Sequence, residues 1–576
     1  MIAPGNRPGV AARAARALLI LSAVVALPAA PVAGQPAAPQ NPRLGLTFSN
    51  YFAGNPMYAR AREAGAAHDR VEFQMRAIWP SPGVWDWQAY DALVADETAH
   101  GLRILAVLTA PPLWASDPNV PYESWPAPAN LHLPWNHPEN HWAQFVFQTV
   151  SRYRAIIKDW QVWNEPDIRA YWKMPEAPAS LFAQLLRVTY EAVKAADPQA
   201  TVVLGGFLYR HDQWPSPITL WNAIRDLPDS AARNNYFDVA AFHLYDGGTC
   251  ETWDVIEDFR LNMTRADRGG LLPHPLWITE TGIRHWDGYP GSPPPGARYA
   301  WPDEAASFLI QNYTYALHKN AGRYYYFRTT DDDSPDQWGL IRLDGSLRPA
   351  WRAFQVAAQH LPAAFAFSTR VWSNNNTVSR ISFWGTPLGR VSVIWNITNT
   401  GQTYVFGSVL PTGTLVTQNG ATTPITFTNN QYTFTLPAAP NFTWHNPPDL
   451  CLVGSPPLIL IERDVTPPVA AIDPLPAITT QPTITLTWNG SDDAAGVWSY
   501  DLQYRVQAGG WITLATWVNA TPRAFSGQHG VTYGFRARAR DRAGNEQAWQ
   551  TAAIATTTVR LPNIHPVAFA PIVCAP

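Results

Sequence analysis

The chain has 576 residues, enough for about two to four domains, and a net charge of −3. This near-neutral charge gives no basis for binding nucleic acid or an anionic membrane. Three cysteines in so long a chain exclude a disulfide scaffold and a cysteine-rich zinc module. Only 15% of the residues are charged, whereas 27 are tryptophan and 54 are proline. Few charges and many aromatic rings suit an exported protein that handles sugars, because aromatic faces stack on pyranose rings.

The N-terminus has the pattern of a signal peptide. Three arginines precede an apolar core at residues 17–27, and small residues at 32–34 offer a cleavage point. The alternative is a membrane anchor, but the core is shorter than the roughly 20 residues that a span requires, and prolines follow it. We therefore expect residues 1–34 to be a signal peptide, residues 35–42 to be a disordered leader, and the mature protein to be secreted without a membrane span.

Residues 43–362 alternate between apolar strands and helical patterns of about 12 to 15 residues, which predicts a parallel sheet. Strands are expected at 43–49, 69–75, 103–109, 159–165, 201–207, 237–245, 275–280 and 323–327. Helices are expected at 60–67, 88–101, 141–153, 181–196, 254–268, 304–319 and 349–360. Eight such units in about 320 residues are normal for a (β/α)8, or TIM, barrel. The long loop at 110–140 follows the third strand, so we expect it at the end of the barrel where such folds place their chemistry.

The remaining chain is predicted to be all-β. Residues 363–463 consist of short strands rich in valine, threonine and isoleucine without an intervening helix, which indicates a β-sandwich. Residues 464–559 form a third module of alternating strands with a turn at 541–545. This module resembles a bacterial fibronectin type III-like repeat, which implies a second β-sandwich with a spacing or adhesive role. The last residues, 560–576, are apolar and rich in proline, and we expect a terminal strand or a segment for surface attachment.

Two glutamates end two of the predicted strands. The stretch 159–166 is a buried strand that ends on Glu165, and Pro166 is expected to hold Glu165 extended and to stop the strand. The stretch 275–282 has the same design and carries Glu280 before a glycine. Parallel α/β folds place their chemistry at the carboxyl ends of strands, and a pair of carboxylates there is what a glycosidase requires. The alternative is two surface glutamates at strand ends.

The motif Trp-Asn-Glu-Pro that ends at Pro166, followed by Ile-Thr-Glu-Thr-Gly ending at Gly282, resembles clan A of the retaining glycoside hydrolases. The likeness is closest to the branch that includes β-xylosidases and α-iduronidases. It implies a (β/α)8 barrel with the acid/base glutamate, Glu165, after strand four and the nucleophile, Glu280, after strand seven. The spacing agrees, since three units of about 30 residues separate those strands. The resemblance also implies that the β-domain at 363–460 packs on the barrel.

The same resemblance implies roles for four polar residues. Asn164 would hydrogen-bond the sugar 2-hydroxyl, although a strand-end asparagine can also cap backbone groups. Arg70 matches a strand-two arginine that supports the nucleophile, and a guanidinium there would keep Glu280 ionised. Tyr245 matches a strand-six tyrosine that contacts the nucleophile, and His243 matches the histidine two residues before it. A lone histidine on a strand is equally often a satisfied core residue.

Four tryptophans in the expected loops are candidate sugar platforms, although plain packing explains each of them equally well: Trp114, Trp172, Trp286 and Trp338. No metal-ligand spacing occurs, since the histidines between residues 132 and 141 suit a solvated loop. The acidic run at 331–333 could bind calcium, but a solvated loop explains it better. We therefore expect neither a metal nor another cofactor.

The sequence thus predicts a secreted retaining glycoside hydrolase that acts on a glycoside, an oligosaccharide or a polysaccharide. Three alternatives stay open: a catalytically silent barrel that binds carbohydrate or mediates adhesion, a transglycosylase with the same residues, and an adhesin in which the third module matters most. The sugar, its linkage, exo or endo action and the oligomeric state do not follow from the sequence. We expect Cys250 to be free, and a bridge between Cys451 and Cys574 requires Cα atoms within about 7 Å.

Overall fold

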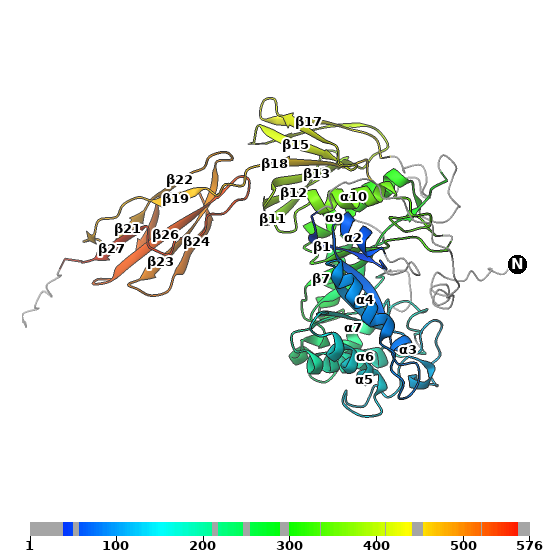
Figure 1. Cartoon of the computed structure of the whole chain (residues 1–576). Coiled ribbons are helices and arrows are strands. Elements are labelled where there is room, and N and C mark those ends of the chain that lie inside the picture. Colours follow the sequence, from blue (N-terminus) through cyan, green and yellow to red (C-terminus); the bar gives the residue numbers. More distant parts are fainter. Residues whose placement is uncertain are drawn as a thin grey trace, which may run out of the picture.

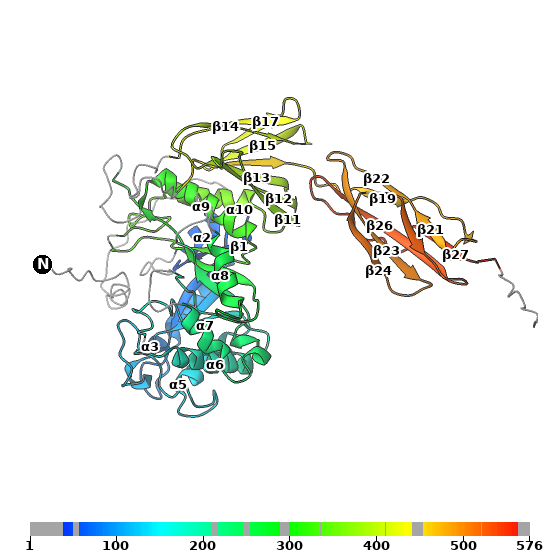
Figure 2. The ribbon, with the colours of Figure 1, turned by 180° about the vertical axis from the view of Figure 1, so that it is seen from behind.

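The computed structural model describes residues 39–49, 57–174, 176–209, 217–245, 254–288, 299–334, 336–408, 410–439, 453–519 and 521–562. These residues form a barrel, a β-sandwich at one side of it, and a third module that extends away from both (Figure 1, Figure 2). The predicted signal peptide and the three cysteines (Cys250, Cys451 and Cys574) lie outside the described residues, so those expectations stay predictions. None of the helices in the described segments has the length and apolar character that a bilayer crossing requires.

Eight parallel strands form the barrel, in the order β5-β4-β3-β2-β1-β10-β7-β6. Parallel bridges from Val203 to Val239 and from Phe207 to Phe242 join the two ends of this order and close the ring. The strands are β1 (Asn41–Thr47), β2 (Ala66–Gln74), β3 (Arg103–Thr109), β4 (Asp159–Val162), β5 (Thr201–Val203), β6 (Ala240–His243), β7 (Leu276–Thr281) and β10 (Tyr324–Tyr326). The predicted (β/α)8 barrel is confirmed, although β1 already begins at Asn41, inside the leader that we expected to be disordered.

Helices lie in the connections between these strands, on the outside of the ring (Figure 1). They are α2 (Tyr58–Ala64), α3 (Met75–Ile78), α4 (Gln88–Ala99), α5 (His141–Tyr153), α6 (Ala179–Ala196), α7 (Pro217–Arg225), α8 (Val255–Thr264), α9 (Pro302–His318) and α10 (Pro349–His360). Shorter elements are η1 (Leu113–Ala115), η2 (Ala231–Tyr236), β8 (Arg284–His285) and β9 (Tyr299–Ala300). The sequence did not predict α7, because a helix of nine residues that begins on a proline presents too short an apolar period.

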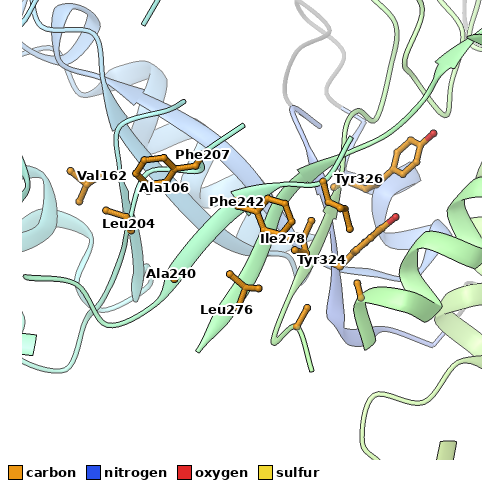
Figure 3. Packing of buried hydrophobic residues seen from close by; sticks show 14 of the residues in the cluster. Ala106, Val162, Leu204, Phe207, Ala240, Phe242, Leu276, Ile278, Tyr324 and Tyr326 are labelled. Atoms are coloured by element: carbon orange, nitrogen blue, oxygen red, sulfur yellow. The ribbon is translucent and has the colours of Figure 1, made fainter. Parts of the chain in front are cut away.

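The two faces of the barrel strands belong to two separate hydrophobic clusters. One small cluster takes its residues from the strands alone: Leu105, Val203, Val239, Ala241, Trp277 and Tyr325. The large cluster contains the alternate residues, such as Ala106, Val162 and Ile278, together with residues of the helices (Figure 3). Since successive side chains of a strand point to opposite faces, the small cluster fills the inside of the barrel. The inside is therefore a packed core, and polar groups gather only at its ends.

The predicted β-sandwich follows the barrel. Its larger sheet has the order β11-β12-β13-β18-β15-β16, and β14 pairs with β17. The strands are β11 (Phe367–Trp372), β12 (Val378–Thr386), β13 (Gly389–Asn396), β14 (Gln402–Gly407), β15 (Thr412–Thr417), β16 (Thr422–Thr426), β17 (Gln431–Leu436) and β18 (Leu458–Glu462). Trp395 of β13 belongs to the same hydrophobic cluster as the barrel helices. Gln311 of α9 also donates to the Ser455 carbonyl over 2.7 Å, so the sandwich covers barrel surface.

The third module is a separate β-structure with its own core around Trp488 and Phe535. Its strands are β19 (Val469–Ile472), β20 (Ile478–Thr479), β21 (Thr483–Leu486), β22 (Trp488–Ser491), β23 (Val497–Val506), β24 (Ile512–Val518), β25 (Arg523–Ser526), β26 (Thr532–Asp541) and β27 (Ala555–Val559). The Gly385 N–H of the sandwich donates to the Ala543 carbonyl of this module over 3.1 Å. Its likeness to fibronectin type III stays a prediction.

Two buried acidic side chains form a pair between β2 and α4. Asp69 precedes Arg70 on β2, and Glu97 lies on α4. Neither side chain is exposed, and among the described residues no N–H group donates to Glu97, whose carboxyl group is within hydrogen-bond reach of Asp69. Burial raises the pKa of Asp69 to about 8, even though the Ser49 and Arg70 N–H groups donate to it. Burial and the neighbouring Asp69 charge also raise the pKa of Glu97 well above its ordinary value. The pair therefore holds a proton at neutral pH.

We predict that this pair makes the fold less stable as the pH rises. Because both carboxyl groups have a higher pKa in the folded chain than in the unfolded chain, the folded state binds more protons between about pH 4 and pH 8. The free energy of unfolding should fall over that range, by about 1.4 kcal/mol per pH unit for each excess proton. Glu97→Gln should flatten the decline, because the amide supplies a donor that does not titrate.

Urea unfolding at several pH values measures this effect. Asp226→Asn is the matched control, because the Asp226 side chain is exposed and, among the residues described, pairs with its neighbour Arg225 alone. The control should follow the wild-type decline. Identical slopes for wild type and Glu97→Gln would show that the acid pair does not titrate as described.

Candidate active site

Glu165 and Glu280 lie at the carboxyl ends of β4 and β7. The Glu165 N–H donates to the Gly206 carbonyl over 3.0 Å, and φ is +70° at Trp163 and +41° at Glu165. The expectation that Pro166 holds Glu165 extended is therefore wrong. The bond to the segment after β5 outweighs the preference of a residue before proline. Left-handed backbone costs about 1 to 2 kcal/mol per residue, and such strain is common at functional sites.

Three side chains surround the Glu280 carboxylate. Arg70 Nη1 donates to Oε1 over 2.6 Å, and the Tyr245 hydroxyl donates to Oε2 over 2.5 Å. His243 Nδ1 lies 3.5 Å from Oε2. Burial alone would raise the pKa of Glu280, but the charges of His243 and Arg70 and the hydrogen bonds from Tyr245 and Arg70 hold it below its ordinary value. Glu280 is therefore ionised at neutral pH.

Arg70 is fixed by three acceptors at once. Besides Glu280, its Nε donates to Gln161 Oε1 and its Nη2 donates to Asn164 Oδ1, each over 2.7 Å. Gln161 in turn donates to the Thr279 hydroxyl over 3.2 Å. The Arg70 side chain is only 2% exposed, so its charge acts through little water. The guanidinium thus connects the ends of β2, β4 and β7.

The two glutamates share His243. His243 Nδ1 lies 2.8 Å from Glu165 Oε1, and one carboxyl oxygen of each glutamate and a ring nitrogen of His243 all lie within 4.8 Å of one another. Retaining glycosidases hold their two carboxyl groups about 5 to 5.5 Å apart, whereas inverting ones need about 6.5 to 9.5 Å for a water between them. One oxygen of each carboxyl group therefore lies closer to the other than the inverting arrangement requires, which favours the retaining one.

Gly206 makes room for His243. The His243 ring is fully buried, and its Nε2 has no hydrogen-bond partner among the described residues. A Cβ atom at Gly206 would overlap Nε2 of this ring and would lie 2.7 Å from the Thr279 hydroxyl. The small residue after β5 therefore lets the imidazole approach Glu165.

Sequence reasoning missed several residues of this site, namely Gln161, Gly206, Asp167 and Tyr171. Asp167 accepts from the Leu208 and Tyr209 N–H groups over 3.0 and 2.9 Å, and burial raises its pKa to about 6. Burial raises the pKa of Tyr171 well above its ordinary value, and the charges of Glu165 and Glu280 add to this effect. Of these residues, Gln161 alone could have been found beforehand, because it is the inward-facing residue two before Trp163 on a predicted strand.

The four candidate tryptophans lie in different surroundings. Trp338 is beside the site, with its ring centroid 5.3 Å from that of Tyr245. Trp114 packs against Trp79 and donates to the Pro80 carbonyl. The ring centroid of Trp286 lies 6.0 Å from that of Tyr299. The expectation for Trp172 is wrong: it is 1% exposed and packs edge-on against the Trp163 ring, so it offers no face to a sugar.

Within the part of the chain that the structure describes, two groups of acidic and histidine side chains are close enough to surround a cation. One is Glu165, His243 and Glu280, but Arg70 and Tyr245 already occupy the Glu280 oxygens. The other consists of Asp464, Asp492 and Asp541 at the start of the third module. The Glu280 oxygens of the first group thus already have donors, and among the described residues the second group is marked by its acidity alone.

No family model and no curated protein matches this chain. Its structure is similar to a family 39 glycoside hydrolase from the gut symbiont Bacteroides cellulosilyticus WH2, at 18% identity and a TM-score of 0.53 over 74% of this chain and 81% of that one. It is also similar to a GH30 endoxylanase from Clostridium papyrosolvens C71, at 12% identity and a TM-score of 0.50 over 74% and 98% of the two chains. This chain has their fold. A likeness at such identity concerns the fold alone.

We predict that Gly206→Ala destabilises the protein through His243. The added methyl group must displace either the imidazole or the Thr279 side chain, and overpacking of a core costs about 1 to 3 kcal/mol. Gly510→Ala is the matched control, because a Cβ atom there meets nothing within 4 Å. Chemical unfolding measures both variants; a Gly206→Ala variant as stable as the control would mean that this contact is not tight.

Proposed function

We propose that the protein is a secreted retaining glycoside hydrolase that cleaves O-glycosidic bonds by double displacement. One observation supports this most directly: two carboxyl groups at strand ends have oxygens within 4.8 Å, and one of them is held ionised by Arg70 and Tyr245. The fold that it shares with glycoside hydrolases agrees with this function. The apolar segment before residue 34 supports export.

Glu280 is the nucleophile of this proposal. Its carboxylate attacks the anomeric carbon and forms a glycosyl ester, while the bond to the leaving oxygen breaks. Glu165 gives its proton to that oxygen, so that a neutral alcohol departs. The Asn164 side chain accepts a hydrogen bond from Arg70, which also donates to Glu280, and suits a contact with the sugar 2-hydroxyl.

The second displacement returns both residues to their starting states. Esterification removes the negative charge of Glu280, which favours the ionised form of the neighbouring Glu165. Glu165 then takes a proton from water, the hydroxide attacks the anomeric carbon, and the ester bond to Glu280 breaks. Two inversions give net retention of configuration.

A catalytically silent barrel is the rival function. Such a barrel would need neither an ionised Glu280 nor a histidine between the two glutamates, yet both are present. A transglycosylase would use the same residues with an alcohol in place of water. Product analysis with and without an added alcohol acceptor separates the two enzymes.

We predict different losses for the two glutamates on aryl glycosides. Glu280→Ala should lose nearly all turnover on every substrate, because the attacking group is gone. Glu165→Ala should lose about 10²- to 10⁴-fold on poor leaving groups, which need the proton, and far less on dinitrophenyl glycosides. Azide should rescue Glu165→Ala and give a glycosyl azide of retained configuration.

Steady-state kinetics across leaving groups and NMR of the first product measure these outcomes. If Glu280→Ala were the variant sensitive to the leaving group, the two roles would be inverted. A first product of inverted anomeric configuration from the wild type would exclude the double-displacement mechanism. Absence of turnover on all aryl glycosides would favour the silent barrel.

We also predict that the third module does not take part in turnover of small substrates. Its described contacts run to the sandwich, as in the hydrogen bond from Gly385 to Ala543 and the contact between the Phe367 and Trp498 rings. A chain that ends before Asp464 should keep kcat/KM on an aryl glycoside within about twofold, since no group near Glu280 is removed. Loss of that activity in a truncated protein that still unfolds cooperatively would contradict this division.

A further inference from the structure

A third carboxylate, that of Glu72, lies on the same strand face as Arg70. Side chains alternate along β2, so Arg70, Glu72 and Gln74 share the face that points into the barrel end. Glu72 is two residues nearer the carboxyl end, which is about 6.6 Å further along the strand. Arg70 itself reaches the nucleophile Glu280. Glu72 therefore lies nearer the open end of the barrel than Arg70, which contacts the nucleophile.

The surroundings of Glu72 agree with this position. Burial raises its pKa, the Gln74 hydrogen bond and the charges of Arg70 and Arg76 oppose this rise, and the charge of Glu280 adds to it. The negative charges of Glu72 and Glu280 thus repel each other. The Tyr171 hydroxyl lies in the field of the same groups, Glu165, Glu280 and Glu72.

Glu72 keeps acceptor capacity that the protein does not use. Gln74 Nε2 donates to Oε2 over 2.5 Å, and among the described residues no donor binds Oε1. Gln74 is itself held, since its Oε1 accepts from Arg76 Nε over 3.1 Å. Unlike Arg70, the Glu72 side chain is partly exposed. A carboxylate oxygen that is both fixed and accessible is suited to accept a hydrogen bond from a ligand.

We propose that Glu72 determines the substrate class, by accepting a hydrogen bond from a hydroxyl group of a neutral sugar bound at Glu165 and Glu280 and by disfavouring a uronic acid there. This inference rests on the proposed glycosidase function. A sugar hydroxyl can donate to the unused oxygen of Glu72. A uronate offers no proton at its carboxylate and brings a further negative charge beside Glu72 and Glu280.

The test compares neutral aryl pentosides and hexosides with the corresponding aryl uronides, in both anomeric forms. Wild type should turn over a neutral glycoside at least about tenfold faster in kcat/KM than its uronide. Glu72→Gln keeps the shape and removes the charge, so it should lower kcat/KM on the neutral substrate and narrow or reverse that ratio. Glu123→Gln, at an exposed carboxylate that pairs with Arg169 and Lys173, should change neither value.

Monodeoxy substrates identify the hydrogen bond itself. The loss caused by Glu72→Gln should vanish for the one deoxy sugar that lacks the bound hydroxyl and should persist for the others. A merely structural role of Glu72 would give the same loss for all of them. Equal or faster turnover of uronides by wild type, or an unchanged ratio in Glu72→Gln, would overturn the proposal.

Measurement of binding in the absence of turnover tests the role of Glu72 independently of the catalytic mechanism. In the Glu280→Gln variant, calorimetry with the same uncleaved glycosides should show tighter binding of the neutral sugar, by about tenfold. Preferential binding of the uronide, or no binding of any neutral sugar, would overturn the role of Glu72. Trapping of wild type by a 2-fluoroglycosyl fluoride reports on Glu280 alone, so its failure would count against the proposed function and not against the sugar preference.

Discussion

The buried guanidinium of Arg70 is the interaction on which the rest of the site depends. A charge removed from water is unfavourable unless it is paired and its hydrogen bonds are satisfied, and Arg70 meets this condition only with Glu280, Asn164 and Gln161 together. Removing one partner of such a pair costs about 3 to 5 kcal/mol, because the other charge stays buried. The ionised state of Glu280 and the geometry of three strand ends therefore sustain each other.

The barrel confines this polar group to one end. Apolar side chains such as Leu105, Val203 and Trp277 fill the interior, so charged groups lie at its ends, where partners from several strands converge. Close packing also decides how the groups meet. Gly206 has no side chain, His243 fills the space, and the imidazole reaches both carboxylates. A network of this kind is stable because nearly every member has a partner.

Much of this arrangement was predictable from the sequence. The alternation of strands and helices predicted the barrel, and the two motifs around Glu165 and Glu280 located the carboxylates, since strand ends are visible in the hydrophobic pattern. Arg70, His243 and Tyr245 followed from a resemblance to a known clan, and the structure brings them to Glu280.

The rest depended on packing that a single sequence does not display. Trp172 is as aromatic as Trp338, and only the tertiary structure shows that one is enclosed while the other borders Tyr245. The sequence pattern did not point to Gly206, because this residue acts by leaving space that the His243 ring occupies. Glu165 departed from the preference of a residue before proline, since a hydrogen bond across the sheet outweighed a local tendency.

The contact between the sandwich and the third module restricts their relative motion. A backbone hydrogen bond joins Gly385 of the sandwich to Ala543 of the module. The Phe367 ring of the sandwich stacks on Trp384 and also contacts Trp498 of the module. At Gly385 and Gly544 there is no space for a side chain between the two bodies. A junction so filled is a poor hinge. The module is thus a rigid extension of the sandwich, so the orientation of the module and the orientation of the barrel are fixed together.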